Sequence, residues 1–239
     1  MTIGGFHKFS LIDYPEKISA VIFTRGCNFR CAYCHNHALI HPRLLESQVH
    51  EEDVLSFLNS RKGLLDGVVV SGGEPLLQVD IEVFIKEVRL MGYKVKLDTN
   101  GSEPERLTGL LKEGLIDYVA MDYKAPLKTY KRGAGVDVDT ARIKKSLNMI
   151  TESDIPYEVR TTMFSGLGVD CIFDMMSELS SMNVKSYFLQ FFKPFPGCTE
   201  DLSVEYKNIE RLNKELKSRF KRYGIRNIKL EGDIFTMLC

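Results

Sequence analysis

The sequence predicts an α/β fold in which parallel strands alternate with helices and curve into a partial barrel. Runs of apolar, β-branched residues alternate with segments of helical periodicity, and the 239 residues contain no internal repeat. Strands separated by helices imply βαβ units and a parallel sheet, and right-handed crossovers curl such a sheet toward a barrel. About six such units fit into the chain, which is too few for a full eight-fold barrel. The predicted fold class is therefore a partial (β/α)6 TIM-like barrel.

Each element is expected where its own periodicity appears. Strands are expected over the β-rich apolar runs 19–24, 67–71, 94–97, 118–121, 157–163 and 186–192. Helices are expected over 51–59, 81–91, 104–113, 140–151 and 169–182, where apolar residues recur at helical spacing. A long charged helix is expected over 205–223, a loop over 131–135, and a short strand with a tail over 227–239. We expect one domain over residues 1–239, with its core at about 17–193.

The composition argues against several classes of protein. The 32 Lys and Arg balance the 32 Asp and Glu, so nothing indicates nucleic acid or an anionic membrane as a partner. No apolar run approaches the roughly 20 residues that span a bilayer. The N-terminus also lacks the basic region and apolar stretch of a signal peptide. We therefore expect a cytoplasmic protein.

Three of the six cysteines lie within eight residues, just after the first predicted strand. Cys27, Cys31 and Cys34 have the spacing C-x3-C-x2-C. The other three are scattered, at Cys171, Cys198 and Cys239. The crowding favours a metal site in a reducing compartment over disulfides. Three thiolates on one loop can hold a four-iron cluster and leave one iron without a protein ligand.

Two glycines and a glutamate follow the second predicted strand. Gly72 and Gly73 would let the backbone approach a ligand closely, and Glu74 comes next. A Gly-Gly turn is common and says little alone. However, active sites of parallel α/β folds gather at the carboxyl ends of the strands, where the cysteine loop also begins. We therefore expect these three residues to contribute to the site.

Charged residues follow the third and fourth predicted strands. Asp98 and Asn100 come after one, and Asp122 and Lys124 after the other. The carboxylates suit a hard cation, and Lys124 would supply positive charge for a ligand carboxylate. Equally, Asp98 and Asn100 could cap a turn or the next helix. Arg160, inside the fifth strand, could bind a ligand carboxylate in a polar cavity or lie unremarkably at the sheet rim.

The sequence resembles the radical S-adenosylmethionine (SAM) superfamily, in which SAM binds the open iron of a four-iron cluster. The resemblance is closest to the activases of glycyl radical enzymes, and among these to activases of anaerobic ribonucleoside-triphosphate reductase. It rests on the segments GGFHKFSLIDYPEK and FTRGCNFRCAYCHN, with DTNG at 98–101 and DYK at 122–124. It extends over about residues 4–192. The resemblance implies a barrel of the radical SAM type.

The resemblance also implies the chemistry of an anaerobic oxidoreductase. A reduced [4Fe-4S] cluster would cleave SAM to methionine and a 5′-deoxyadenosyl radical, which would take a hydrogen atom from a glycine of a partner enzyme. The implied partner is a glycyl radical enzyme, first of all an anaerobic ribonucleotide reductase. Flavodoxin or ferredoxin would donate the electron.

Roles for individual residues follow from the same resemblance. Cys27, Cys31 and Cys34 would ligate the cluster. The residues that would contact SAM are Tyr33, Gly72, Gly73, Glu74, Asp98, Asn100, Lys124 and Arg160. A monovalent cation beside the SAM carboxylate would be held by Asp98, Asp122 and the backbone of Thr99 and Met121.

The sequence departs from the formate-lyase activases in one respect and leaves two other interpretations open. Those activases carry a histidine near the end of the last barrel strand, where this chain reads FFKP at 191–194. Either Lys193 or Gln190 would substitute for it, or the contact would be absent. One alternative is a radical SAM enzyme acting on a small molecule, such as a deazaguanine-forming synthase. The other is a zinc-binding interaction module, with His35 or His37 as the fourth ligand.

Overall fold

A computed structural model describes residues 1–40, 49–195, 202, 208–230 and 233–238 of the chain, with side chains up to residue 227. The chain forms two compact units. The first unit comprises Met1–Asn28, Asn36–Ala120 and Ser153–Pro156, and the second comprises Phe29–His35, Met121–Glu152 and Tyr157–Cys239. The boundary therefore divides the cysteine loop, which leaves Cys27 in the first unit and Cys31 and Cys34 in the second.

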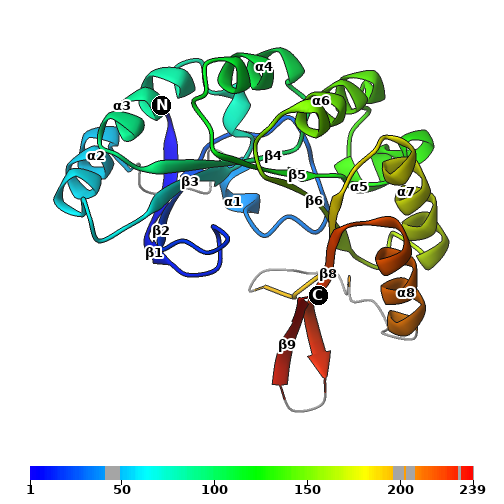
Figure 1. The fold of residues 1–239 in the computed structure, drawn as a ribbon. Helices are drawn as coiled ribbons and strands as arrows, with labels where there is room; N and C mark the ends of the chain where they lie inside the picture. The colour runs from blue at the N-terminus through cyan, green and yellow to red at the C-terminus, as the bar shows by residue number, and fades with distance from the viewer. Residues whose placement is uncertain (41–48, 196–201, 203–207, 231–232, 239) are drawn as a thin grey trace. The chain divides into compact units, whose positions relative to one another are not determined.

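The first unit alternates strands and helices around a mostly parallel sheet (Figure 1). Its strands are β1 (Ile3–Ser10), β2 (Ser19–Thr24), β3 (Gly67–Gly72), β4 (Lys94–Thr99) and the start of β5 (Tyr118–Asp122), in that spatial order. Its helices are α1 (His37–Ile40), α2 (Glu51–Ser60), α3 (Ile81–Leu90) and α4 (Pro104–Lys112), with a 3₁₀ turn η2 (Pro75–Leu77). β1 pairs antiparallel with β2, whereas β2, β3 and β4 pair parallel.

The second unit continues the same pattern and ends in a hairpin. It contains the end of β5 and the strands β6 (Tyr157–Met163), β7 (Ser186–Phe191), β8 (Arg222–Leu230) and β9 (Asp233–Leu238). Its helices are α5 (Lys131–Ala134), α6 (Thr140–Glu152), α7 (Val169–Ser181) and α8 (Ile209–Arg219), with a 3₁₀ turn η3 (Leu127–Thr129). β6, β7 and β8 pair parallel, and β9 folds back antiparallel on β8.

Burial of strands and helix faces explains why these segments form. Residues 68–70 of β3 are fully buried valines, as expected for a strand covered on both faces. Helix α3 buries Ile81, Phe84, Ile85 and Val88, which recur at the spacing of one helix face. The parallel pairing brings the carboxyl ends of β2, β3 and β4 to one edge, and the predicted ligand residues begin there.

The six predicted strands are all present, two with the predicted bounds and four with one end shifted by one or two residues. β4 runs to Thr99 and β5 to Asp122, so both aspartates predicted for the site belong to strand ends rather than to loops. None of the helices in the described ranges combines the length and apolar character that crossing a membrane requires.

The sequence-based prediction was wrong in several places. β1 was missed because its residues IGGFHKFS include two adjacent glycines and few buried side chains, and its strand form comes from pairing with β2. The predicted helix 205–223 ends at Arg219, because Arg222 and Tyr223 pair with Ser186 and Tyr187 of β7. The expected short strand after 227 is instead the hairpin β8–β9, which begins at residue 222. Residues 205–207 lie outside the described part of the chain.

One carboxylate ties α3, β4 and the approach to β5 together in the first unit. Asp117 accepts bonds from Arg89 Nη1 at 2.6 Å, Lys94 Nζ at 2.9 Å and the Val95 N–H at 2.9 Å. Burial alone would raise the pKa of Asp117, but the Val95 N–H and the charges of Lys94 and Arg89 hold it below its ordinary value.

We expect Asp117→Asn to lower the free energy of unfolding by about 2 kcal/mol at neutral pH, the scale of hydrogen bonds to a charged group. A lowered pKa contributes stability above the unfolded value of about 3.9 and loses it as the pH falls through the folded value. The difference between wild type and variant should therefore shrink below about pH 4. Urea denaturation at several pH values measures it.

Asp137→Asn provides the matched control. Asp137 pairs with Lys131, but its side chain is 88% exposed, so its loss should cost less than about 1 kcal/mol. An Asp117→Asn variant as stable as this control would contradict the account.

Candidate functional site

In the first unit, the end of β3 packs its backbone directly on the start of the cysteine loop. The Gly73 N–H donates to the Thr24 carbonyl at 2.9 Å, and the Glu74 N–H donates to the Gly26 carbonyl at 2.8 Å. A Cβ on Gly73 would lie 1.9 Å from the Gly26 oxygen, so only glycine permits this approach. The predicted Gly-Gly pair therefore holds the peptide next to Cys27.

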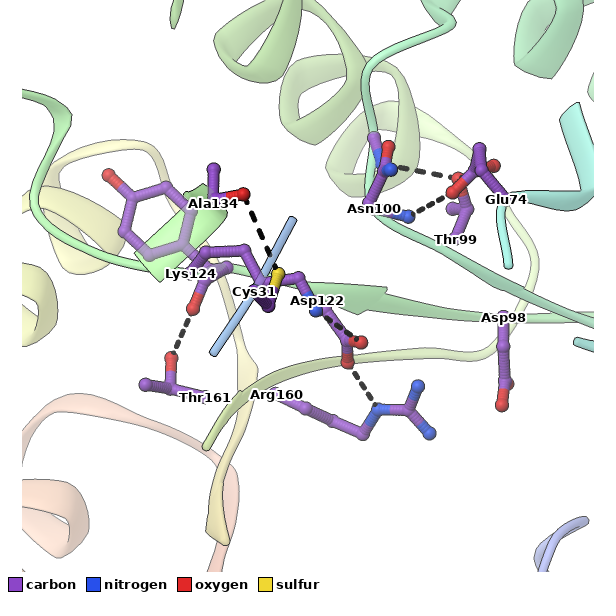
Figure 2. Close-up of polar contacts among 12 residues, drawn as sticks. Cys31, Glu74, Asp98, Thr99, Asn100, Asp122, Lys124, Ala134, Arg160 and Thr161 are labelled. Atoms are coloured by element: carbon purple, nitrogen blue, oxygen red, sulfur yellow. Dashed lines mark hydrogen bonds and ion pairs between the residues drawn. The ribbon is translucent and has the colours of Figure 1, made fainter. Parts of the chain in front are cut away.

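Glu74 is fully buried, and its carboxylate braces the segment DTNG (Figure 2). Oε1 accepts from the Thr99 hydroxyl at 2.7 Å and the Leu76 N–H at 3.1 Å, and Oε2 accepts from the Asn100 N–H at 2.7 Å. The carboxylate is thus committed to the protein. A contact between Glu74 and SAM, predicted from the sequence, would have to use its backbone.

Asn100 links this brace to the cysteine loop. Its Oδ1 accepts from the Ser102 N–H at 2.9 Å, which is the turn-capping role considered for it. Its Nδ2 donates to Asn28 Oδ1 at 2.9 Å and lies 3.9 Å from Cys27 Sγ. The turn-capping interpretation and the site interpretation are therefore compatible.

Asp98 forms an ion pair with a buried lysine that the sequence analysis overlooked. Lys96 Nζ lies 2.5 Å from Asp98 Oδ1, and the Ser71 hydroxyl donates to Oδ2 at 3.2 Å. The Lys96 side chain is 2% exposed. Lys96 and Asp98 are two residues apart on β4 and so share a face of the sheet. A lysine inside the apolar run KVKLDT is the signal that could have identified this pair.

In the second unit, helix α5 holds the other side of the cysteine loop. The Arg30 N–H donates to the Ala134 carbonyl at 2.8 Å, and Cys31 Sγ lies 3.9 Å from the same oxygen (Figure 2). A Cβ on Gly135 would lie 1.9 Å from the Arg30 oxygen. The residues KRGAG, predicted as an ordinary loop, are therefore part of the structure that supports Cys31.

Tyr33 lies buried between the second and third cysteines. Its ring packs on Phe164 with centroids 4.5 Å apart, and Lys124 Nζ lies 5.8 Å from the ring centre. Its hydroxyl is buried and meets no nitrogen or oxygen partner among the described residues, although a hydrogen bond from it to the Cys31 thiol opposes the rise in the pKa of that thiol. Burial raises the pKa of the neighbouring Cys31 thiol, and the charge of Lys124 opposes that rise.

Asp122 joins the two basic residues that the sequence predicts for the site (Figure 2). Its Oδ2 lies 2.9 Å from Lys124 Nζ, and its Oδ1 lies 2.9 Å from Arg160 Nε. Burial would raise the pKa of Asp122, but Arg160 and Lys124 together hold it well below its usual range. Burial alone would lower the pKa of Lys124, but the negative charge of Asp122 raises it well above its ordinary value. Arg160 thus pairs with a carboxylate of the protein itself.

The predicted monovalent cation does not fit these carboxylates as they stand. Both oxygens of Asp98 bond Lys96 and Ser71, and both oxygens of Asp122 bond Lys124 and Arg160. A cation would have to displace a protein donor in either place. Nowhere in the described residues do three His, Cys, Asp or Glu side chains converge to hold a single metal ion. The cation stays a prediction.

The donor set on the cysteine loop fits an iron–sulfur cluster better than any other group. Cys27, Cys31 and Cys34 form no disulfide among the described residues, and each is partly exposed. Thiolates are the ligands of such clusters, and a cluster spreads its ligands over several irons rather than drawing them to one ion.

His35, the next residue, packs edge-on against Phe192 at 5.6 Å and Phe195 at 5.1 Å, and bonds the Lys193 backbone. Burial lowers the pKa of His35. An imidazole therefore does reach the segment where the expected histidine is missing from the sequence. Among the remaining cysteines, Cys171 lies 3.8 Å from Arg132 Nη1, whereas Cys198 and Cys239 lie outside the described residues.

We expect Gly135→Ala to reduce cluster loading, because its Cβ would push the Arg30 peptide and with it Cys31. Gly63→Ala is the matched control: φ is +73° at Gly135 and +78° at Gly63, but a Cβ at Gly63 meets nothing within 4 Å. Both changes should cost about 1 kcal/mol of stability through the left-handed backbone. Iron and sulfide content after anaerobic reconstitution should fall only for Gly135→Ala. Equal loading of the two variants would show that the close approach does not support the cysteine loop.

Comparison with known proteins identifies the family to which this chain belongs. The profile of the Radical SAM superfamily matches residues 21–179. A Methanocaldococcus jannaschii protein named as a glycyl-radical enzyme activating enzyme is 34% identical over 229 residues, covering 92% of this chain and 92% of that protein. A Pyrococcus abyssi protein named as a GTP 3′,8-cyclase is 26% identical over 207 residues, covering 82% of this chain and 67% of that protein.

Solved structures agree on the fold. Streptococcus suis SuiB bound to S-adenosylmethionine matches with a TM-score of 0.65 at 17% identity over 83% of this chain, which spans only 46% of the SuiB chain. Methylornithine synthase matches with a TM-score of 0.62 at 14% identity, covering 87% of this chain and 64% of that one. These likenesses confirm the predicted fold class, an α/β fold of the radical SAM type. The family profile and the Methanocaldococcus relative establish that this chain is an enzyme of the radical SAM superfamily.

Proposed function

We propose that this enzyme activates a glycyl radical enzyme. The observation that carries the proposal is the similarity to the Methanocaldococcus protein named for this activity, which extends over 92% of both chains. When bound, the [4Fe-4S] cluster would supply the electron that cleaves SAM to methionine and a 5′-deoxyadenosyl radical, which takes a hydrogen atom from a glycine of the partner. Cys27, Cys31 and Cys34 would hold the cluster.

The second unit supplies the residues for the charged end of SAM. Lys124 is buried, carries a proton firmly because of Asp122, and lies against the Tyr33 ring beside Cys31 and Cys34. A fixed ammonium of this kind would bind the SAM carboxylate. The buried Tyr33 hydroxyl, which meets no nitrogen or oxygen partner among the described residues, supports a polar contact with the adenosine part. Arg160, whose Nε bonds Asp122, supports a further contact along the ligand.

The first unit supplies rigidity rather than charge. Gly72 and Gly73 bring β3 against the cysteine loop, and Glu74 locks DTNG behind it. This arrangement would keep the loop of Cys27 in one conformation before the cofactors bind, so that less ordering is needed on binding. The backbone of Gly73 and Glu74 would meet the amino group of SAM.

The partner is proposed at two levels of detail. A glycine-bearing radical enzyme follows from the Methanocaldococcus relative. An anaerobic ribonucleotide reductase, with flavodoxin or ferredoxin as donor of the electron, follows only from the sequence resemblance.

We expect anaerobically reconstituted protein to bind about four irons and four sulfides, as one [4Fe-4S] cluster requires. With dithionite, SAM and anaerobic ribonucleotide reductase it should form 5′-deoxyadenosine and a glycyl radical signal in electron paramagnetic resonance. Substituting any of the three loop cysteines by alanine should abolish both products, whereas Cys171→Ala should leave them unchanged.

The outcomes of that experiment separate the alternatives. One zinc and no sulfide would favour a zinc-binding module. Formation of 5′-deoxyadenosine without a glycyl radical on any candidate partner would reject the activase and favour small-molecule chemistry. GTP would then be the first substrate to try, given the Pyrococcus relative.

We expect Lys124→Met to raise the KM for SAM by about tenfold or more, because it removes a buried charge from the carboxylate site. Lys86→Met is the control, since Lys86 is an exposed lysine paired with Glu113 at 2.7 Å. Initial rates of 5′-deoxyadenosine formation over a range of SAM concentrations measure the change. An unaltered KM in a fully loaded Lys124→Met variant would place the SAM carboxylate elsewhere.

A further inference from the structure

Five charged side chains of the second unit form a continuous row that begins beside the cysteine loop and ends on the C-terminal hairpin. In order they are Lys124, Asp122, Arg160, Glu158 and Arg226. Their signs alternate, with positive charges at both ends. The first three are residues of the predicted site. The last two were not expected from the sequence, and Arg226 lies beyond the part of the chain that the family profile matches.

Arg226 reaches from β8 across β7 to β6. Its Nη1 and Nη2 lie 3.1 Å and 2.8 Å from the two oxygens of Glu158, which is the forked geometry of the strongest arginine–carboxylate pairs. On the way, its guanidinium lies over the Phe188 ring, 4.1 Å from the centroid. The Glu158 side chain is 2% exposed, so this carboxylate depends on its partners for charge compensation.

Glu158 also anchors Arg160. The two residues are two apart on β6 and so share a face, and Arg160 Nη1 lies 3.8 Å from Glu158 Oε1. Phe188 is the register partner of Arg160 on β7. The guanidinium of Arg160 is therefore held at Nε by a hydrogen bond to Asp122 at 2.9 Å, and at Nη1 by a longer ion-pair contact with Glu158 that exceeds hydrogen-bond length. Without Glu158, the positive charges of Arg160 and Arg226 would repel each other across Phe188.

We propose that Glu158 and Arg226 are positioning residues that hold Arg160, and through it Asp122 and Lys124, in the orientation that binds SAM. The inference rests on the proposed function of Lys124 and Arg160. Its physical basis is that a guanidinium held at two points presents its remaining donors in one direction. A planar, pre-oriented group of this kind loses less entropy when it binds a ligand.

The test uses reconstituted holoenzyme and the equilibrium dissociation constant for SAM, measured by calorimetry with the cluster oxidised so that no turnover occurs. We expect Arg226→Met and Glu158→Gln each to weaken SAM binding by about tenfold, the scale of one hydrogen bond between charged groups. Arg226→Lys keeps the charge and loses the fork, so its effect should be intermediate. Because the two residues act as one unit, the double variant Glu158→Gln/Arg226→Met should bind SAM no more weakly than the weaker single variant.

Arg222→Met is the matched control, since Arg222 is an exposed arginine on the same strand. It should bind SAM as the wild type does. Iron content and unfolding temperature separate positioning from a general structural role. The inference requires weaker SAM binding in variants whose iron content and unfolding temperature equal those of the wild type. If SAM affinity, iron content and unfolding temperature all fall together, the inference is overturned.

Two further outcomes identify what has failed. If Arg226→Lys and Glu158→Gln load fully and bind SAM like the wild type, the positioning roles are wrong while the proposed function stands. If wild-type holoenzyme binds no SAM, the proposed function and the positioning roles both fail. Should Arg226→Met not fold, Arg226→Lys decides, because it keeps the charge that Glu158 requires.

Discussion

The carboxylate of Asp122 is the interaction on which the charged half of the site depends. It is shared by Lys124, two residues away, and by Arg160 from the neighbouring strand. It raises the pKa of Lys124 and compensates the charge of Arg160, although both side chains are largely buried. A buried ammonium or guanidinium without such a partner would be costly, and a lysine would tend to lose its proton. The site can therefore offer positive charge to an anionic ligand because the carboxylate of Asp122 lies between Lys124 and Arg160.

The fold could be predicted to the extent that local pattern decides it. Buried runs such as GVVVS and the apolar spacing of α3 identify their elements without reference to the rest of the chain. The errors in the strands concern segments whose form depends on a neighbour. β1 has two adjacent glycines and few buried side chains, and only its pairing with β2 makes it a strand. Arg222 and Tyr223 extend a charged run that resembles a helix, and their pairing with β7 overrides that local preference.

The site residues could be located from the sequence better than their contacts could. Strand ends and the cysteine motif identify where Glu74, Asp98 and Asp122 lie, but not that all three carboxylates bond donors of the protein. Lys96 and Glu158 were not predicted for the site, although each is a charged residue inside a predicted strand, as Arg160 is. The supporting role of Gly135 depends on a contact with Arg30, over a hundred residues away, and no local pattern encodes such a contact.

The buried brace at Glu74 also bears on how relatives of this chain could be recognised. Its two oxygens accept from a hydroxyl and two peptide N–H groups, so a glutamine there would turn an amide N–H₂ toward another donor. Glutamate at this position and a hydroxyl-bearing residue at position 99 are thus chemically coupled, although 24 residues separate them in the sequence. Chains that keep the pair together would share this loop architecture, whereas chains with only the cysteine spacing need share nothing beyond the cluster.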